Sequence, residues 1–368
     1  MRVKKGQILV TCSGTIGKVA LVSRTLDKQI FSHDLIRINV KNPADVGFIY
    51  AFLRSETGNT LLQTNRYGSV IQHIEPDHLA DIPVPNPADK IKTKISDLVI
   101  RSYDLRDRSN ELIDKATAML VDALCLPPIS KLKTERFCDE YETNNYNVKL
   151  SDLGGRLDGS YHLPITKAIT AHLQRYAGEL TTVGDERISK NIILPGRFKR
   201  VYVEKGQGRA FFGGKQLYEL DPTNKKYLSL TQHGDRIKEQ LELHENMILI
   251  TRSGTIGKVT IVPKHWEHWV ASEHIIRVIP ASNEIAGYLS IFLASEYGYP
   301  LIRRFTYGSV VDEIDERHVA KIPFPLLKAK AVQDEIACIA LEANAFRYEA
   351  YRLEQEALQI MNDEVIFS

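Results

Sequence analysis

The sequence predicts an α/β (α+β) chain that is internally duplicated, with long antiparallel coiled-coil helices separating its mixed domains. The first observation is a repeat: 8–19 (ILVTCSGTIGKV) returns as 248–259 (ILITRSGTIGKV). Further identities keep the same offset without a gap until residue 85, which matches residue 325. The second observation is apolar spacing in alternating steps of three and four after each copy. A period this long indicates a duplicated domain and not a solenoid repeat.

Each copy is predicted to begin with short strands and to continue into a helix. In the first copy, 7–10, 19–22 and 35–40 have strand character, and 13–17 is a turn between the first two. Apolar spacing in 49–62 predicts a helix. The proline-rich segment 82–87 is predicted to be rigid and extended, because proline lacks an N–H donor and disfavours helix in the preceding residue.

Two long helices are predicted after the copies, each with an apolar seam of period about 3.5. Small side chains at some seam positions let two helices approach closely, so a mutual antiparallel pair is favoured over two separate amphipathic surface helices. Charged residues flank the seam, Arg106 and Asp107 among them. The larger seam residues are Leu98, Leu105, Leu112 and Met119 in the first helix, and Ile339, Phe346, Leu353 and Ile360 in the second.

The repeat divides the chain into five predicted segments. Residues 149–245 have no counterpart upstream, so the first domain is expected to be an N-terminally incomplete version of the second. The segments are a partial first domain (1–88), a long helix (89–127), a polar linker (128–148), a complete second domain (149–327) and a second long helix (328–368).

Composition sets broad limits on the class of protein. The chain has 48 basic and 46 acidic residues, which is not the strongly basic balance of a typical nucleic-acid binder, although charge can be segregated between surfaces. The 4 cysteines lie far apart without ligand spacing, which predicts free thiols in a reducing compartment. No signal peptide or long apolar segment is visible, so a soluble cytoplasmic protein is expected.

Known catalytic motifs do not fit the repeated segment. Residues 13–18 (SGTIGK) are not a phosphate-binding P-loop, because two residues separate the glycines and a valine follows the lysine. A tight hairpin with glycines at positive φ fits better. No methyltransferase, nuclease or serine-hydrolase motif is present. We therefore predict no catalytic residue, no metal site and no cofactor of the chain's own. His78 and His318 are predicted to cap helices.

Basic and aromatic residues gather in 197–215, where lysine suits phosphates, and glutamine or arginine suits base edges. A solvated basic loop is the alternative there, and 67–70 and 307–310 are either base-contacting loops or packing turns. Arg37 and Arg277 are predicted buried ion pairs, and Arg156 and Asp158 an ion pair that fixes the start of the domain. Candidate DNA contacts are Lys199, Arg200, Gln207, Arg209, Lys215, Arg252, Lys258, Arg303, Arg304 and Tyr307, with Lys18, Arg66 and Tyr67 in the first copy.

These motifs, in this order, resemble those of the DNA-specificity subunit of type I restriction–modification systems. The resemblance rests on 156–161 (RLDGSY), 252–258 (RSGTIGK), 307–310 (YGSV) with Ile314, 322–325 (IPFP), and the heptad helix that follows. It covers nearly the whole chain. The first copy has the later motifs and lacks the opening one.

The resemblance implies a non-catalytic subunit with two target-recognition domains, each reading half of a split double-stranded DNA sequence. It also implies that the long helices set the spacing and dock methyltransferase (modification) subunits, which bind S-adenosylmethionine. A translocating endonuclease (restriction) subunit is then a further partner. The alternatives are a half-type or solitary recognition subunit of another anti-phage system, a nucleic-acid-modifying enzyme with an unrecognised site, and a coiled-coil assembly protein. The basic residues of 197–215 argue against the last of these.

Overall fold

The computed structural model describes residues 2–64, 66–68, 72–134, 146–222, 225–308 and 310–367. Ser69, Val70, Cys138, Ser309 and most of the predicted linker, including 143–145, lie outside these ranges. The chain forms two compact units, one of Met1–Glu111 with Phe346–Ser368 and the other of Leu112–Ala345. Both long helices therefore contribute to both units. The bounds of the five predicted segments remain predictions.

The first unit contains a three-stranded antiparallel sheet of order β2-β1-β3. Alternate side chains of the sheet, such as Ile8 and Val10, enter a core with Phe48. The strand predicted for 35–40 ends at Ile38, and the helix predicted for 49–62 is two helices, because Ser55 is extended (ψ 161°) and ends the first. The elements are β1 (Ile8–Thr11), β2 (Val19–Leu21), β3 (Leu35–Ile38), η1 (Pro43–Asp45), α1 (Val46–Arg54), α2 (Glu56–Thr64) and α3 (Pro76–Ala80).

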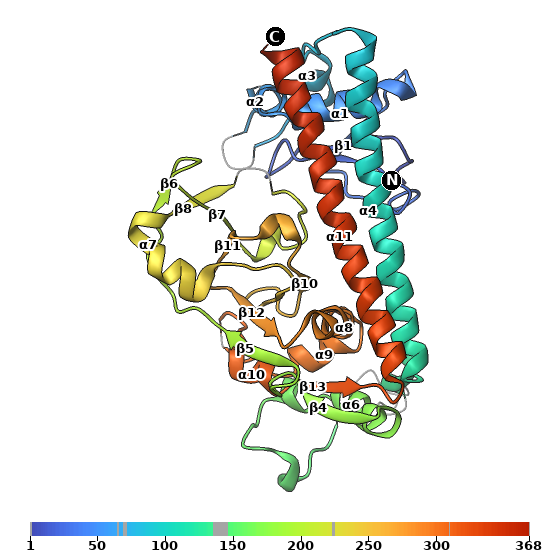
Figure 1. Ribbon diagram of the computed structural model, residues 1–368, viewed down its shortest axis with the longest axis vertical. Helices are drawn as coiled ribbons and strands as arrows, with labels where there is room; N and C mark the ends of the chain where they lie inside the picture. The colour runs from blue at the N-terminus through green and yellow to red at the C-terminus, as the bar shows by residue number, and fades with distance from the viewer. Residues whose placement is uncertain are drawn as a thin grey trace. The chain divides into compact units, whose positions relative to one another are not determined.

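The first part of α4 (Asp89–Ala123) packs antiparallel against the last part of α11 (Lys330–Met361) in this unit (Figure 1). Small side chains make the approach close: Ser102 and Ala350 are fully buried, and the Ser102 hydroxyl donates to the Ala350 carbonyl at 2.7 Å. Of the predicted seam residues, Leu353 and Ile360 are buried, whereas Leu98, Leu105 and Phe346 are half-buried. The short π-helical turn η7 (Asn362–Ile366) follows α11.

Two residues of the charged flank lie inside the first unit. Arg106 pairs with Glu354, whose side chain is 2% exposed and also accepts from the Tyr50 hydroxyl at 2.5 Å. Burial alone would raise the pKa of Glu354, but the nearby Arg106 lowers it, so the carboxylate stays charged. Asp107 is 1% exposed and accepts from the Ser23 hydroxyl at 2.6 Å. The heptad pattern predicts that Arg106 and Asp107 lie beside the seam. It does not predict that other parts of the chain bury them.

The second unit repeats the sheet of the first and adds to it. Its main sheet has the order β10-β9-β12-β5, in which β5 pairs antiparallel with β12. A second sheet has the order β11-β7-β8-β6 with one parallel pair, β11 and β7, and β13 pairs with β4. The strands are β4 (Glu179–Thr182), β5 (Ser189–Ile193), β6 (Tyr202–Val203), β7 (Gly208–Phe212), β8 (Lys226–Ser229), β9 (Ile248–Thr251), β10 (Val259–Ile261), β11 (Val270–Ala271), β12 (Ile275–Pro280) and β13 (Pro323–Leu326).

Helices cover the main sheet of the second unit, and its core includes the end of α4 and the start of α11 through Ala116, Leu120, Ile336 and Ala340. Ile339 is buried there, and Leu112 and Met119 are half-buried. The helices are α5 (Ile129–Thr134), α6 (Pro164–Tyr176), α7 (Leu230–Arg236), α8 (Asn283–Ala294), α9 (Gly298–Arg303) and α10 (Glu316–Ala320). Short turns are η2 (Leu150–Asp152), η3 (Gly159–His162), η4 (Gly214–Gln216), η5 (Ile237–Leu241) and η6 (Lys264–Trp266).

The predicted polar linker begins with structure. Helix α5 lies within it, and Leu132 is buried in the core of the second unit. The prediction missed Leu132 because the segment as a whole has a polar composition. None of the described helices is long and apolar enough to cross a membrane.

Candidate nucleic-acid interface

The turn between β9 and β10, residues 252–258, is the centre of the candidate site. Gly254 and Gly257 have φ of 70° and 85°, which confirms the predicted hairpin glycines. The Thr251 hydroxyl donates to the Thr255 carbonyl at 2.6 Å and accepts from the Lys258 N–H at 3.0 Å. The hairpin turn is thus held from inside by one side chain, which leaves its outer residues available for contact.

A second loop, residues 307–313, is fastened to the hairpin turn. Tyr307 and Glu313 exchange backbone hydrogen bonds of 2.9 and 2.7 Å, and Ser253 bridges to Glu313. The Glu313 carboxylate accepts from Arg252 at 2.5 Å and from Arg197 at 3.0 Å. Arg252 is 8% exposed, so its guanidinium positions the loop and is not displayed on the surface. The loop exposes Tyr307 and, beyond it, apolar side chains.

A third group lies on α9 and beside it. A side chain at Gly257 would meet the ring of Tyr299 at 3.2 Å, so the hairpin turn rests directly on that tyrosine. Arg303, one helical turn further on, donates to the Tyr299 hydroxyl at 3.3 Å and is exposed. The Lys258 ammonium lies 5.3 Å from the ring centroid of Tyr218. Two tyrosine rings therefore lie next to residues of the hairpin turn.

Arg200 is tied into the same neighbourhood. Its guanidinium bonds Glu273 at 2.7 Å and lies 5.1 Å from the Phe211 ring centroid. Burial alone would lower the pKa of Arg200, but the hydrogen bond to Glu273 raises it, so the group stays charged. Next to Glu273, the His274 ring bonds the Ser253 hydroxyl at 2.7 Å. Arg200 is half-buried and paired, which suits a positioning role better than a base contact.

Other residues of the basic segment are displayed at different places. Lys199, Gln207, Arg209 and Lys215 are all exposed. Lys215 belongs to η4, whose Gly214 lies against Thr251 at the foot of the hairpin turn. Gln207 and Arg209 lie at the opposite end of β7 from η4, roughly 17 and 10 Å from the last residue of the strand at the rise of a β-strand. The structure therefore separates these two from the hairpin turn, although they are close to Lys215 in sequence.

Arg304 is less available than its sequence position suggests. It stacks on the ring of Tyr161, with 4.5 Å between the guanidinium carbon and the ring centroid, and burial lowers its pKa. Arg156 holds the same region: it pairs with Asp158 at 2.7 and 2.8 Å, as predicted, and also donates to the Thr306 carbonyl at 3.0 Å. Both arginines fasten the opening motif of the domain to the chain that follows α9.

The first copy has the same frame with different side chains. Gly14 and Gly17 have φ of 68° and 86°, and Asn59 donates to the Gly17 carbonyl at 2.5 Å. Lys18 is half-buried, and Arg66 and Tyr67 are exposed. The Tyr67 hydroxyl donates to Glu75 at 2.5 Å. All three predicted contact residues of this copy thus lie around its own hairpin turn or the loop beside it.

Two further predictions have clear outcomes. His78 and His318 cap α3 and α10, where each ring nitrogen accepts a backbone N–H, so the capping prediction is confirmed. Arg277 is 1% exposed but is no simple ion pair, because it donates to the carbonyls of Ser272, Ile275, Ala271 and Leu241. Burial lowers the pKa of Arg277 to about 9, which still leaves it charged at neutral pH. Arg37 is half-buried in β3.

Sequence reasoning missed several residues of this site. Glu313, Tyr299, Tyr218 and His274 were not candidates, because an isolated carboxylate or tyrosine has no distinctive spacing. Comparison of the copies contains a signal for two of them, since Glu313 aligns with His73 and Tyr299 with Asn59. Cys12, Cys125 and Cys338 are free thiols, as predicted. One group of side chains, His244, Glu267 and His268, has the donor atoms for a metal ion.

The fold defines a class of chain in which two related α/β domains each lead into a long helix. Residues 1–114 and 201–340 match the family described as the type I restriction modification DNA specificity domain. The match covers more than half of the chain, which therefore belongs to this family. The resemblance found in the motifs is confirmed, and with it the role of a non-catalytic specificity subunit.

Three solved structures align with most of this chain at low sequence identity. The type I system S subunit from M. genitalium is 16% identical, with 98% of this chain and 84% of that chain covered and a TM-score of 0.36. The HsdS subunit from Thermoanaerobacter tengcongensis is also 16% identical, with 98% and 81% covered and a TM-score of 0.33. A chain from a study of the assembly and conformational transition of the type I R-M system is 15% identical, with 97% and 82% covered and a TM-score of 0.34. Comparison with curated proteins finds no match.

Proposed function

We propose that the chain reads a split target in double-stranded DNA, with one part read at each hairpin turn. The observation that supports this proposal is that the two copies share the backbone structure of the hairpin turn but differ in the side chains next to it. Both copies keep the hairpin glycines and the threonine that brackets them, whereas Asn59 and Gln63 of one copy are Tyr299 and Arg303 in the other. Different donors and acceptors on one frame are what two different half-sites require.

Charge and exposure assign the roles within the complete copy. Arg303 and Tyr307 are exposed beside the hairpin turn and are suited to base edges, because arginine can bond guanine through two parallel hydrogen bonds. Lys258, Lys215 and Lys199 carry point charges suited to phosphates. Arg252, Arg200 and Arg304 are paired or stacked, and we assign them to holding the loops. We propose that Gln207 and Arg209 contact a part of the duplex farther from the hairpin turn.

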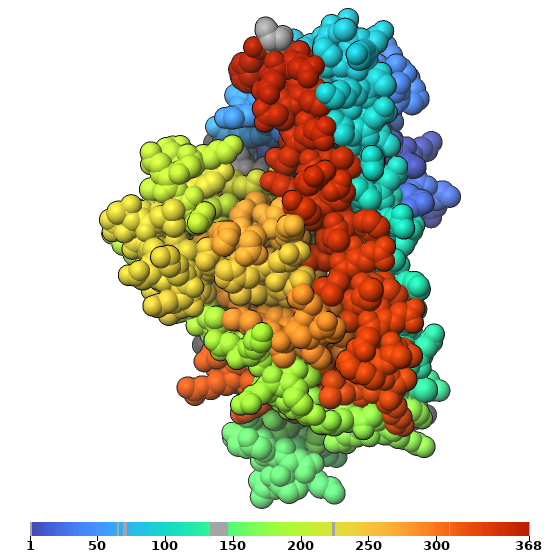
Figure 2. All heavy atoms as spheres, in the orientation of Figure 1, coloured from blue at the N-terminus to red at the C-terminus, as the bar shows by residue number. Residues whose placement is uncertain are grey.

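The helix pair is the proposed spacer and docking surface for partners. In each unit α4 and α11 are antiparallel, and Figure 2 shows one face of α11 at the surface of the described part of the chain. A helix face at the surface next to each recognition domain gives a methyltransferase subunit a place to bind. S-Adenosylmethionine is then held by that subunit, and the translocating restriction subunit joins the assembled core.

The test is selection from a library of duplexes randomised over the target, with the chain and its modification subunits together. We expect two short motifs separated by a fixed unread spacer. Inserting one base pair into that spacer should abolish selection, because the two copies belong to one chain. A single contiguous motif would contradict the proposal, and a palindrome would indicate the half-type arrangement. Methyl transfer by the purified chain alone would indicate an enzyme instead.

A further inference from the structure

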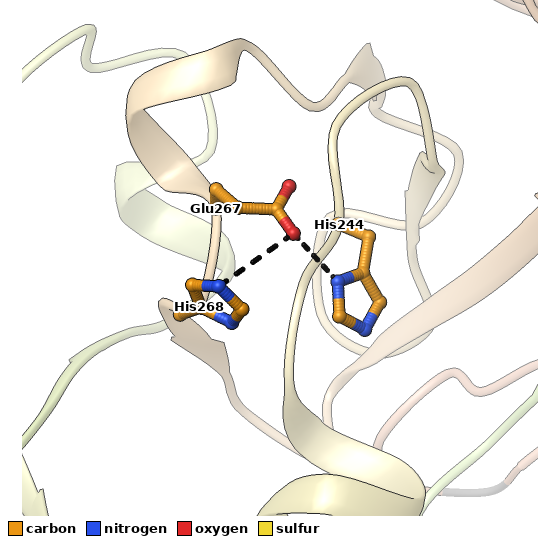
Figure 3. A group of neighbouring side chains, drawn as sticks. All are labelled: His244, Glu267 and His268. Carbon is orange, nitrogen blue, oxygen red and sulfur yellow. Dashed lines mark hydrogen bonds and ion pairs between the residues drawn. The ribbon is translucent and has the colours of Figure 1, made fainter.

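Three side chains that carry possible metal-ligand atoms meet away from the hairpin turn, at the junction of two short turns in the second unit (Figure 3). His244 lies between η5 and β9, and Glu267 and His268 lie between η6 and β11. The Nδ1 atom of His244 is 2.7 Å from Glu267 Oε1, and His268 Nε2 is 4.0 Å from the same oxygen. One ligand atom from each residue lies within 4.8 Å of the others.

We propose that His244, Glu267 and His268 bind one divalent cation of borderline softness, with Zn²⁺ as the preferred ion. Two imidazoles and one carboxylate are the donor types that such ions select, and hard ions such as Mg²⁺ and Ca²⁺ prefer oxygen alone. Tetrahedral zinc bonds of about 2.0–2.2 Å put neighbouring donor atoms about 3.3–3.6 Å apart. The closest pair must therefore open by less than about 1 Å, and the widest must close by on the order of 1 Å. Water completes the coordination shell.

The surroundings already orient the donors. His268 Nδ1 bonds Glu242 Oε1 at 3.0 Å, which directs Nε2 toward Glu267. A carboxylate on the far nitrogen is the usual partner of a metal-bound histidine, because it fixes the ring and increases its basicity. The second oxygen of Glu267 accepts from the Glu245 N–H at 2.6 Å, so Oε1 is left for the ion. Each donor therefore has a defined atom facing the centre.

Backbone hydrogen bonds join the two turns that carry these side chains. The His268 N–H donates to the Leu243 carbonyl and the Leu243 N–H to the Trp269 carbonyl, both at 2.9 Å. His268 has a φ of 63°, a left-handed conformation that a non-glycine residue adopts at a cost. That conformation places its ring beside Glu267. A bound ion would thus clip the end of η5 to the start of β11, which pairs with β7.

The experiment uses the full-length chain, freed of metal by a chelator, with Zn²⁺ and then Co²⁺ as probes. We expect one equivalent of Zn²⁺ by titration calorimetry, a rise in unfolding temperature on adding it, and visible Co²⁺ absorption bands of a low-symmetry site with nitrogen and oxygen donors. His244→Ala, His268→Ala and Glu267→Gln should each weaken Zn²⁺ binding at least tenfold. Glu242→Gln, which acts only through His268, should weaken it about 10- to 100-fold without changing the stoichiometry.

His33→Ala is the matched control, because His33 is exposed and has Asp34 at 3.7 Å but no second histidine beside it in the described part of the chain. It should bind Zn²⁺ as the native chain does. Glu267→Gln keeps an acceptor for the Glu245 N–H, and its unfolding temperature in chelator shows whether it is folded. Equal Zn²⁺ affinity in the native chain and in the His244→Ala, His268→Ala double variant would overturn the proposal. So would a native chain whose unfolding temperature does not respond to Zn²⁺.

Discussion

The two copies of the repeat share one close contact between a domain helix and a long helix, and they differ in several side chains around the hairpin turn. A side chain at Gly47 would lie 2.5 Å from the Ser96 carbonyl oxygen, and one at the matching Gly287 would lie 2.3 Å from that of Ala337. In each copy this glycine lets a helix of the domain touch the long helix directly. At this shared position no larger residue fits.

The differences lie around the hairpin turn. Arg252 and Glu313 pair at 2.5 Å in the second copy, and the matching residues of the first copy are Cys12 and His73. The loop is still attached in both, because Ser13 and Ser253 bridge to the same relative position. The backbone frame thus survives the loss of the ion pair. The side chains around it can therefore vary, which is what the proposed reading of two different half-sites requires.

The copies also differ in how each is fastened to its long helix. In the first, Asp107 of α4 accepts from the Ser23 and Thr25 hydroxyls at 2.6 Å each and from the N–H groups of Arg24 and Thr25. In the second, Asn344 of α11 donates to the Val262 carbonyl at 3.0 Å. Both reach the chain just after the second strand of the hairpin. The anchor is charged in the first copy and neutral in the second. We therefore expect pH to change the stabilising contribution of the first anchor and not that of the second.

The largest effect is expected from filling the shared helix contact. Gly47→Ala and Gly287→Ala should each destabilise the native state by about 3 kcal/mol or more, because the added methyl meets a backbone oxygen that cannot move aside. Hydrogen exchange should show the loss of protection mainly in the unit that carries the substitution. The measurement is denaturant unfolding combined with exchange on the full chain.

Gly234→Ala is the control for this pair. Nothing lies within 4 Å of a side chain added at Gly234 in α7, so alanine should be neutral or slightly stabilising there. If Gly287→Ala were as stable as Gly234→Ala, the close contact between α8 and α11 would be wrong.

The next effect concerns the charged anchor. Asp107→Asn should cost about 2–3 kcal/mol at neutral pH, because the amide cannot accept all the hydrogen bonds made to the buried carboxylate. Asn344→Ala should cost about 1–2 kcal/mol, since it removes two neutral hydrogen bonds, one to the Val262 carbonyl and one to Asn246 Oδ1. Thermal or denaturant unfolding of both variants beside the native chain gives the comparison.

The pH dependence separates the two anchors further. Burial alone would raise the pKa of Asp107, but hydrogen bonds from Ser23 and Thr25 lower it below the usual value. Its contribution is therefore complete above a pH of about 4 and is lost as pH falls through the lowered pKa. The difference in unfolding free energy between the native chain and the Asp107→Asn variant should disappear in that acidic range. The cost of Asn344→Ala should stay constant there, and a parallel loss in both would contradict the assignment.

Much of this architecture could be predicted from the sequence because it follows from repetition and periodicity. The offset of the copies located the hairpin turns, and the heptad spacing located α4 and α11. The break at Ser55 and the anchor Leu132 were missed, since each is a single-residue feature that composition averages away. The burial of Asp107 and the pairing of Arg252 with Glu313 depend on distant chain segments meeting. Local patterns contain no information on such contacts.

The roles proposed at the hairpin turn can be tested by making one copy resemble the other. Tyr299→Asn with Arg303→Gln gives the second copy the polar side chains of the first. The binding free energy that favours the selected base over the others should fall by about 1–3 kcal/mol at one or two positions of one half-site, because the paired hydrogen bonds of the arginine are lost. The other half-site should be unchanged. Selection from a randomised duplex library measures both half-sites together.

The variant Gln207→Ala with Arg209→Ala is informative in the same assay, since these residues lie at the far end of β7. A change in the same half-site positions as the Tyr299, Arg303 variant would show that the hairpin turn is not the main reading element. Unaltered preference in the Tyr299, Arg303 variant, with altered preference in this one, would move the proposed reading surface to β7.

The smallest effect is expected from the matched lysines of the two copies. Lys258 and Lys18 follow the second glycine of each hairpin turn, and both are half-buried. If each neutralises one phosphate, Lys258→Ala and Lys18→Ala should weaken binding to all duplexes alike and reduce the salt slope of log K by about one. The double variant should reduce it by about two, because two separate copies act independently. Binding is measured at several salt concentrations with modification subunits present. A reduction for Lys258→Ala alone would mean that only the second copy contacts the backbone through this lysine, and the symmetry of the two copies in DNA binding would then fail.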